Sequence, residues 1–491
     1  MFRPSDTQLP LFDSTRLLTE RQRRICEKAW PGAFRTKVLP LLRQVEGRFA
    51  VLFSPAEGRP NRPVEIVLGS LILKDLFDLT DDETLQHLDF DAMWWWAFQR
   101  GPEELELSQK TLHNFRAGLL KHEALKQAAS EITDELARQL GLDVSRQRGD
   151  STHIVSNFAE LTRLGMLCET LRLALKRLKE THPDLYSRLG AGVLRRHGEN
   201  SSYADARRKE GRRRLAVVAR DLWRVLQSVD PKAEVTKSSE WGLLKRAFEE
   251  QCAVKAEGTK PRDDDDDAGD GPAPVELKPG RDVPTGSLQT PHDPDVTYSG
   301  HKGQGYEVDL VETCHPDNKA RLILYAGVRP SSQHDSVSTV PIVKQLKAEG
   351  HAPTELVVDT TMGGGGPNAA ALAELGVQLL APAYAAVPEP VEGPLPACPT
   401  DAEAAARWLA QQEAQPDFKE RYAIRAGMES TNSELKRAHG LGNLRVRGKA
   451  RVELAVRLKI LACNLKRAMK AWLTQWREDR AAPAAAAAGE P

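Results

Sequence analysis

β-favouring segments alternate with helical segments over the second half of the chain, and this alternation most restricts the possible folds. In chain order, we expect β-rich runs at 306–313 and 320–328, a helix at 336–348, a strand at 356–360, a helix at 368–375 and a strand at 377–380. Strand, helix and strand in succession predict an α/β fold, because the helices cover the faces of the sheet.

A further strand is expected well before this region, and it carries an acidic residue. The helical pattern of the first 140 residues gives way, after the helix-breaking Gly149, to the β-favouring residues Thr152, Ile154 and Val155. The resulting short strand contains Asp150. A carboxylate within a strand of a covered sheet indicates a functional or paired group, since carboxylates are rarely buried without a partner.

The chain has 491 residues, which exceeds the roughly 250 to 300 residues that one hydrophobic core supports. Periodicity and composition divide it into several predicted units. These are a helical N-terminal domain (1–140), an α/β core (141–158 and 296–475), a helical insertion (159–255), an acidic, Pro-rich linker (256–295) and a disordered tail (476–491).

Composition excludes several classes of protein. No apolar run approaches the roughly 20 residues needed to span a bilayer, so we expect no membrane partner. The N-terminus lacks the order of a secretory signal, and six scattered cysteines form no CxxC pair, so we expect a cytoplasmic protein with reduced thiols. The formal net charge is zero, so electrostatic arguments must rest on where charges lie.

The segment 421–440 carries the most informative side chains. On an ideal helix, Tyr422, Arg425, Glu429 and Lys436 fall within roughly 60° of arc. Such a stripe suits a phosphodiester held by donors while a carboxylate holds a metal. The alternative is a solvated charged helix with ordinary ion pairs. Gly427 lowers helix propensity and could mark a break before Glu429.

The spacing Y-(2)-R-(3)-E-(6)-K resembles the signature of bacterial insertion-sequence transposases of the IS-four type. RGDSTHIVSN around Asp150 and ELVVDTTMGGGG around Asp359 look like the two strands that carry catalytic aspartates in that group. The segment 439–468 resembles their closing segment, and 62–116 looks like their helical N-terminal domain. After Asp359 the chain has a glycine run where many relatives carry Gly-Tyr.

The resemblance implies a DDE transposase with an RNase H-like mixed sheet core. Asp150, Asp359 and Glu429 would be catalytic and would bind Mg²⁺ or Mn²⁺, as two ions. The activity implied is metal-dependent cleavage at element ends, followed by transfer of the 3′-hydroxyl into target DNA. Two alternatives stay open: an RNase H-fold nuclease without strand transfer, and a catalytically inactive DNA-binding protein derived from a transposase.

Double-stranded DNA, as terminal inverted repeats and target, is the partner that the resemblance implies. The segment 434–470 carries eleven Lys or Arg against two Glu, which is typical of a phosphate-binding surface. We expect its apolar stripe from Leu454 to Met469 to pack on the sheet. The predicted DNA-binding residues are Tyr422, Arg425, Lys436, Arg437, Arg445, Arg447, Lys449 and Lys302. Because two DNA ends must be paired for coordinated transfer, we expect a homodimer on DNA. We expect the protein to be associated with the nucleoid.

Three conspicuous motifs are interpreted without a functional role. Trp94, Trp95 and Trp96 could stack on bases, but adjacent aromatics on a short helix more often fill a core. The run Gly363 to Gly366 lacks the Lys-Ser/Thr of a phosphate-binding loop, so a turn is favoured. The acidic run Asp263 to Asp267 is expected to be solvated.

Overall fold

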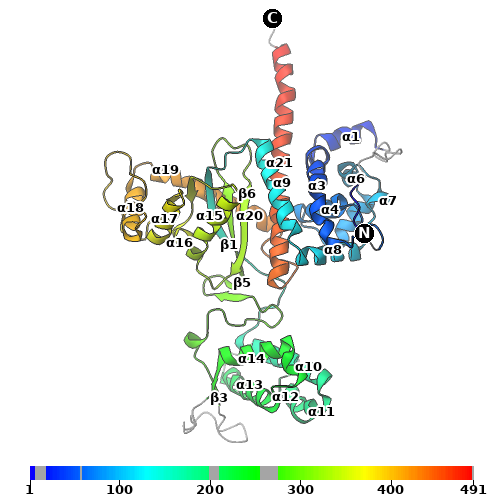
Figure 1. Ribbon diagram of the computed structural model, residues 1–491, viewed down its shortest axis with the longest axis vertical. Coiled ribbons are helices and arrows are strands. Elements are labelled where there is room, and N and C mark those ends of the chain that lie inside the picture. The colour runs from blue at the N-terminus through cyan, green and yellow to red at the C-terminus, as the bar shows by residue number, and fades with distance from the viewer. Residues whose placement is uncertain (6–17, 56–57, 198–208, 255–274, 489–491) are drawn as a thin grey trace.

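The computed structural model describes residues 1–5, 18–55, 58–197, 209–254 and 275–488. Figure 1 shows a central sheet covered by helices, a helical N-terminal domain beside it and a separate helical insertion at one end. The long helix α21 (Lys449–Ala488) runs between the sheet and the N-terminal domain. None of the described helices is both long and apolar enough to cross a membrane.

The central sheet is mixed, and its strands are β1 (Arg146–Ile154), β4 (Thr297–Ser299), β5 (Gly303–Thr313), β6 (Ile323–Pro330), β7 (Glu355–Val357) and β8 (Gln378–Leu380). The main path runs β6-β5-β1-β7-β8, and β4 pairs with the start of β5. β1 is antiparallel to β5 and parallel to β7, while β8 is parallel to β7. The chain is therefore a mixed α/β protein, as predicted.

Both faces of the sheet are covered, each by its own apolar cluster. The helical segments of this region are η8 (Asp335–Val337), α15 (Thr339–Ala348), α16 (Thr360–Gly363), α17 (Gly366–Glu374), α18 (Ala402–Ala414), α19 (Phe418–Tyr422), η9 (Ala423–Ala426) and α20 (Gly427–Ala438). Ile342 of α15 and Leu409 of α18 pack with Leu356 on one face. Met428 of α20 and Val456 of α21 belong to the cluster on the other face.

The N-terminal domain is helical, as predicted. Its elements are α1 (Glu20–Glu27), α2 (Trp30–Ala33), η2 (Phe34–Val38), α3 (Leu39–Val45), η3 (Glu46–Leu52), α4 (Val64–Leu76), α5 (Asp81–Phe90), α6 (Ala92–Phe98), α7 (Pro102–Leu105), α8 (Gln109–Lys121) and α9 (Ala124–Leu140). Thr80 and Glu83 form a capping box at the start of α5, and Ser108 caps α8. Trp94 and Trp96 are buried, which confirms core packing.

The insertion leaves the sheet after β1 and returns before β4. Its elements are α10 (Arg163–Thr181), α11 (Pro183–Leu185), η4 (Tyr186–Gly190), α12 (Ala191–Arg196), α13 (Lys209–Ser228), η6 (Glu234–Lys237), α14 (Ser239–Gln251), β2 (Cys252–Val254), β3 (Val275–Leu277) and η7 (Gly280–Asp282). Leu171 of α10 and Leu222 of α13 meet in one core with Leu244 of α14. The insertion thus has a hydrophobic core of its own.

One segment predicted to be a linker and one predicted to be a disordered tail contain ordered structure. Within the predicted linker 256–295, β3 pairs with β2, and the buried Asp293 accepts hydrogen bonds from Ser156 and Tyr306. The prediction failed there because it rested on composition, which does not register pairing partners distant in sequence. The run Asp263 to Asp267 lies outside the described residues.

The predicted disordered tail 476–491 is also wrong over most of its length, because α21 continues to Ala488. Alanine has the highest helix propensity of the common residues, so an alanine-rich end can prolong a helix that is already nucleated.

The packing of α21 differs from the prediction as well. Leu458, Leu461 and Leu465 of the predicted sheet-facing stripe belong to the core of the N-terminal domain. A different row, which includes Val456 and Cys463, packs on the sheet. Periodicity identifies the apolar faces of a helix but does not say which neighbour each face meets.

Candidate active site

Two carboxylates lie side by side where the central parallel strands diverge. Asp150 is in the middle of β1, and Arg148 of the same strand pairs with Val357 of β7. Asp359 follows two residues after Val357, so the parallel register carries it alongside Asp150. The carboxyl ends of strands in α/β sheets are the usual position of functional side chains.

The burial and charge of Asp150 are consistent with this proximity. Its side chain is 13% exposed. Burial raises the pKa of Asp150, Arg425 opposes that effect, and the negative charge of Asp359 raises the pKa further. Two neighbouring carboxylates in such surroundings require a compensating cation.

Asp359 lies at the start of a helix and not within the strand. It caps α16, where its Oδ1 accepts a hydrogen bond from the backbone N–H of Met362 at 2.7 Å. The glycine run that follows is a turn between α16 and α17, as predicted, and Gly364 and Gly365 have φ of 66° and 68°. Only glycine adopts this left-handed conformation at low cost.

Arg425 connects Asp150 with Glu429. Its Nη2 lies 3.0 Å from Asp150 Oδ1, and its Nη1 lies 3.5 Å from Glu429 Oε1. The Glu429 side chain is 74% exposed, so it can move without disturbing a core. Asp150, Asp359 and Glu429 do not form a group with all ligand atoms within 4.8 Å; among the described residues, only Glu434, His439 and Cys463 do.

Asn432 is a site residue that sequence reasoning missed. Its Nδ2 donates a hydrogen bond to Asp150 Oδ2 at 3.1 Å. It follows Glu429 by three positions on α20, so helical spacing could have identified it. The Nε of Arg425 and the Oδ1 of Asn432 are buried without a hydrogen-bond partner. The first atom can still donate a hydrogen bond and the second can still accept one, so the site can bind a further polar group.

A buried ionic network supports the helix that carries Glu429. Glu312 of β5 is fully buried and accepts hydrogen bonds from Arg148, Thr431 and Arg467. Arg148 also donates to the carbonyl of Ile424 at 2.5 Å, within the 3₁₀ segment η9. A Cβ at Gly427 would collide with Arg148 Nη1. The predicted break near Gly427 is therefore real, and close packing requires glycine there.

Two tyrosines lie near the acidic residues. Tyr422 stacks on Phe418 with ring centroids 5.4 Å apart. Burial raises the pKa of Tyr422, which Arg425 opposes and the charges of Asp359 and Asp150 reinforce. Tyr384 is 63% exposed and its ring covers Gly365. Burial and the charge of Asp359 raise the pKa of the Tyr384 phenol, so an aromatic lies beside Asp359 despite the missing Gly-Tyr.

The other predicted DNA-binding residues fall into two groups. Lys436, Arg437, Arg447 and Lys449 are exposed. Arg445 is half-exposed and donates to the carbonyls of Asp78 and Leu79.

Several other cations are also committed to protein partners. Lys302 donates to Glu307 at 2.9 Å. Within the basic segment 434–470, Lys459 pairs with Asp75 and Arg467 pairs with Glu312, and Lys459 is buried. Part of the positive charge therefore stabilises the fold, because buried cations need acidic partners.

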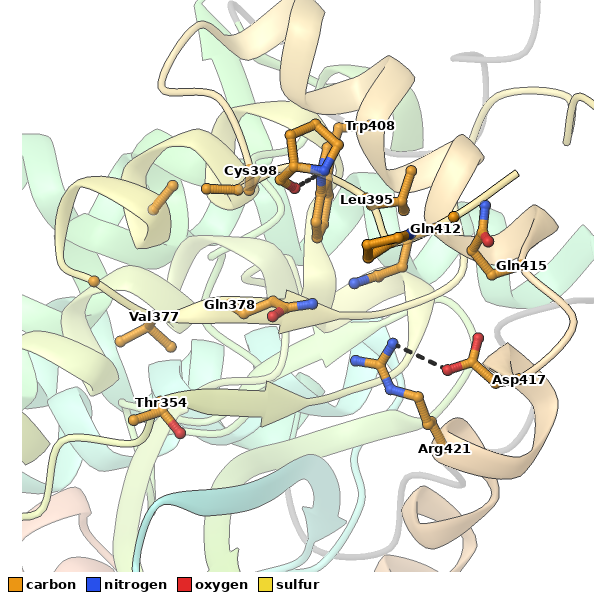
Figure 2. Close-up of a pocket in the computed structure, with 16 residues that line it drawn as sticks. Thr354, Val377, Gln378, Leu395, Cys398, Trp408, Gln412, Gln415, Asp417 and Arg421 are labelled. Atoms are coloured by element: carbon orange, nitrogen blue, oxygen red, sulfur yellow. Dashed lines mark hydrogen bonds and ion pairs between the residues drawn. The ribbon is translucent and has the colours of Figure 1, made fainter. Parts of the chain in front are cut away.

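A cavity of about 660 Å³ lies elsewhere on the same domain (Figure 2). It is lined by Thr354, Val377 and Gln378, at the amino ends of β7 and β8, and by Trp408 and Arg421. Asp359 follows the opposite, carboxyl end of β7. The cavity is therefore separate from the acidic residues.

Comparison with known protein families assigns two parts of the chain. Residues 398–469 match the family described as "Transposase DDE domain", and residues 28–118 match "Transposase domain (DUF772)". No curated protein and no solved structure matches the chain. The first match suggests a nucleic-acid-processing enzyme.

More particularly, the two matches together support a DDE transposase. The match at 398–469 includes Glu429 and α20, but Asp150 and Asp359 lie outside it. The roles of these two aspartates therefore depend on the geometry around β1 and β7.

Proposed function

We propose that the chain is a DNA transposase that cleaves element ends and joins the 3′-hydroxyl to target DNA, using Asp150, Asp359 and Glu429. The observation that carries this proposal is the register of β1 and β7, which sets the two aspartates side by side. The strand order β6-β5-β1-β7-β8, with β5 antiparallel to its neighbours, supports an RNase H-like core. The Y-R-E-K spacing supports assignment to the IS-four type.

The donor set fits Mg²⁺ or Mn²⁺. Carboxylate oxygens are hard ligands, and repulsion between Asp150 and Asp359 favours a cation between them. In the described conformation, the guanidinium of Arg425 supplies positive charge to Asp150 and Glu429. Two bound ions would lower the pKa of the attacking water or 3′-hydroxyl and stabilise the leaving oxygen.

The chain's own residues would orient the DNA. Arg425 pairs with both Asp150 and Glu429 here; if these carboxylates held a metal instead, its planar fork would be available to a phosphate. Asn432 keeps the Asp150 carboxylate oriented through the bond to Oδ2. Tyr422 and the exposed Lys436 and Arg437 would contact the DNA backbone near the cleaved end.

Double-stranded DNA is the proposed partner, through terminal inverted repeats and a target site. A homodimer on paired DNA ends, located at the nucleoid, belongs to the same proposal. The exposed Arg447 and Lys449 extend the basic surface beyond α20. Electrostatic contacts of this kind predict binding that weakens steeply with salt.

The experiment uses the purified full chain, Mg²⁺ and labelled duplexes made from the DNA that flanks its coding region. We expect cleavage at the element end and a strand-transfer product, both lost in Asp150→Asn and Asp359→Asn while DNA binding remains. Asp143→Asn is the matched control, because Asp143 lies outside the site and is half-exposed.

Other outcomes separate the alternatives. Cleavage without a strand-transfer product would indicate a nuclease. If wild type does not cleave and Asp150→Ala leaves metal affinity unchanged, the catalytic proposal is wrong and a DNA-binding role replaces it.

A further inference from the structure

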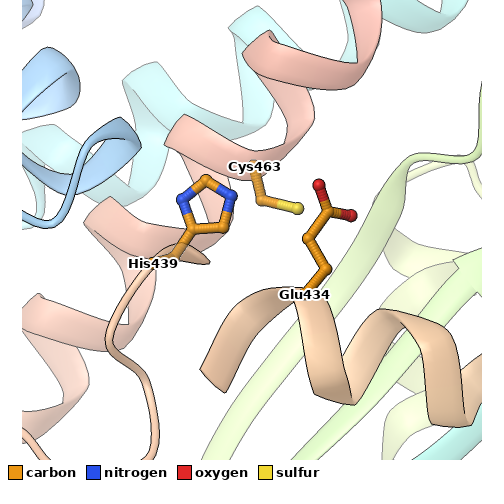
Figure 3. A group of neighbouring side chains, drawn as sticks. All are labelled: Glu434, His439 and Cys463. Atoms are coloured by element: carbon orange, nitrogen blue, oxygen red, sulfur yellow. The ribbon is translucent and has the colours of Figure 1, made fainter. Parts of the chain in front are cut away.

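A second group of metal-binding side chains lies between α20 and α21, apart from the acidic site. Glu434 is on α20, His439 ends that helix, and Cys463 is on α21. Their ligand atoms all lie within 4.8 Å of one another. Figure 3 shows the imidazole, the thiol and the carboxylate pointing toward a common point.

The imidazole of His439 already has the arrangement of a metal ligand. The ring is fully buried, and its Nδ1 lies 3.0 Å from the carbonyl oxygen of Asp75. A carbonyl only accepts hydrogen bonds, so Nδ1 carries the proton and Nε2 carries the free lone pair. A backbone carbonyl behind the distal nitrogen is the usual way in which proteins orient a ligating histidine.

The lone pair of His439 Nε2 has no hydrogen-bond partner, although the atom is buried. Buried polar atoms in proteins are almost always satisfied, so an unpartnered atom aimed at two other ligand groups requires an explanation.

Cys463 and Glu434 complete a mixed donor set. Cys463 is fully buried on the sheet-facing side of α21. Glu434 accepts hydrogen bonds from Lys466 at 3.1 Å and Arg467 at 3.0 Å. Lys466 is 38% exposed and can turn to solvent, while Arg467 keeps its contacts to Glu312 and Thr431. The carboxylate can thus exchange a lysine for a metal without losing Arg467.

We propose that Glu434, His439 and Cys463 bind one thiophilic divalent cation of the Zn²⁺ class. One sulfur, one nitrogen and one oxygen ligand suit zinc, and water would fill the fourth position. Binding breaks the S–H bond of Cys463, forms the S–Zn bond and releases one proton to solvent. Magnesium is a poor competitor, because it prefers a set of oxygen ligands.

The position of this site suggests what the cation would do. It would fix the C-terminal part of α20, where Glu434 lies five residues beyond Glu429, against α21. His439 also contacts Asp75 of α4, so the same cation would connect the N-terminal domain with the α20–α21 contact. The role is structural and independent of the proposed acidic site.

The test uses the metal-free full chain titrated with Co²⁺ and then with Zn²⁺. We expect one equivalent of Co²⁺ to produce a thiolate-to-cobalt charge-transfer band in the near ultraviolet, which Zn²⁺ abolishes and excess Mg²⁺ does not. Cys463→Ala should remove the band. Cys314→Ala is the matched control, since Cys314 is similarly buried but is not a member of the cluster, and should keep the band.

Lys466→Met provides a second, milder variant on a partly exposed residue. Removing the cation that competes for Glu434 should raise Zn²⁺ affinity by roughly tenfold. The absence of the band in wild type, or an equal band in Cys463→Ala, overturns the proposal. If Cys463→Ala does not fold, unchanged Zn²⁺ affinity in Lys466→Met overturns it. Loss of DNA cleavage in the Asp150 variant leaves this site unaffected.

Discussion

Arg425 contacts two of the three proposed metal ligands, and each contact has a different consequence. Its bond to Asp150 joins two largely buried side chains, whereas its contact with Glu429 ends on an exposed carboxylate. The interaction with Asp150 is therefore the stronger one, because solvent screens the exposed pair between Arg425 and Glu429. In the metal-free protein, Arg425 occupies the carboxylate that the proposed metal needs.

Arg425→Ala should raise Mg²⁺ affinity while weakening DNA binding. Loss of a guanidinium that competes for Asp150 is worth on the order of 1 kcal/mol, or roughly fivefold in affinity. Calorimetric Mg²⁺ titration and a DNA-binding assay measure the two effects. Arg421→Ala is the control, because Arg421 pairs with Glu355. Equal or weaker Mg²⁺ binding in Arg425→Ala would show that Arg425 does not compete.

The spacing of residues in the sequence predicted which residues belong to this site, but it did not predict the contacts that these residues make. The stripe of Tyr422, Arg425 and Glu429 was derived for one ideal helix, whereas the structure has a 3₁₀ segment before Gly427. That segment exists because Arg148, from a strand far away in sequence, bonds to Ile424. A pattern within twenty residues cannot register a partner almost three hundred residues away.

At the scale of elements, the start of α20 depends on the absence of one side chain. Gly427→Ala would place a Cβ against Arg148 Nη1 and disturb the bond from Arg148 to Glu312. We expect a loss of about 1 to 3 kcal/mol in the free energy of unfolding, together with reduced cleavage. Chemical denaturation measures the first and a DNA-cleavage assay the second.

Gly242→Ala is the matched control for this substitution. Gly242 lies within α14, and nothing lies within 4 Å of the added Cβ. Alanine there should stabilise the protein by up to about 1 kcal/mol. Equal destabilisation by both substitutions would contradict the close-packing argument at Gly427.

The helical insertion should be sensitive to acid. Asp221 on α13 accepts hydrogen bonds from His197 at 2.8 Å and Arg196 at 2.7 Å. Burial opposes ionisation, but these two donors lower the pKa of Asp221 below its usual value. The stabilisation is therefore complete above about pH 4 and is lost as the pH falls through the lowered pKa.

Asp221→Asn should destabilise the protein by about 1 to 3 kcal/mol at neutral pH. The difference in stability from wild type should shrink as the pH falls below about 4, because wild type loses the charge there. Thermal unfolding of both proteins across pH measures this difference. A difference that is independent of pH would mean that the charge on Asp221 does not contribute.

Helices and strands were predictable because their signals are local. Thr80, with Glu83 three residues later, predicts a helix start that the structure contains. The linker prediction failed at β3, where the partner β2 lies on the far side of the acidic run. Capping and periodicity act within one or two turns, whereas strand pairing depends on residues brought together by folding.

At the scale of the whole molecule, α21 joins two cores. One of its faces packs with the N-terminal helices and another with the sheet. A buried ion pair strengthens the joint, because Lys459 on α21 lies 2.9 Å from Asp75 on α4. Lys459 also donates to the carbonyl of His439. The N-terminal domain and the sheet should therefore unfold together.

Lys459→Met should leave Asp75 buried without its ion-pair partner and cost about 3 to 5 kcal/mol. Lys449→Met is the control on the same helix, since Lys449 is exposed and its pair with Glu453 should contribute under about 1 kcal/mol. In differential scanning calorimetry, the N-terminal domain and the sheet should unfold in one shared transition in wild type and in two separate transitions in Lys459→Met. A single unshifted transition would show that the pair does not couple the two cores.

The helical insertion lies between β1 and β5 in the sequence, and this position makes it a separable module. These strands are antiparallel neighbours, with Ile154 opposite Tyr306, yet the entire helical insertion separates them in sequence. Neighbouring antiparallel strands need only a tight turn to connect them. The insertion thus occupies a hairpin loop, where a foreign module can be exchanged or removed while the register that aligns Asp150 with Asp359 is kept.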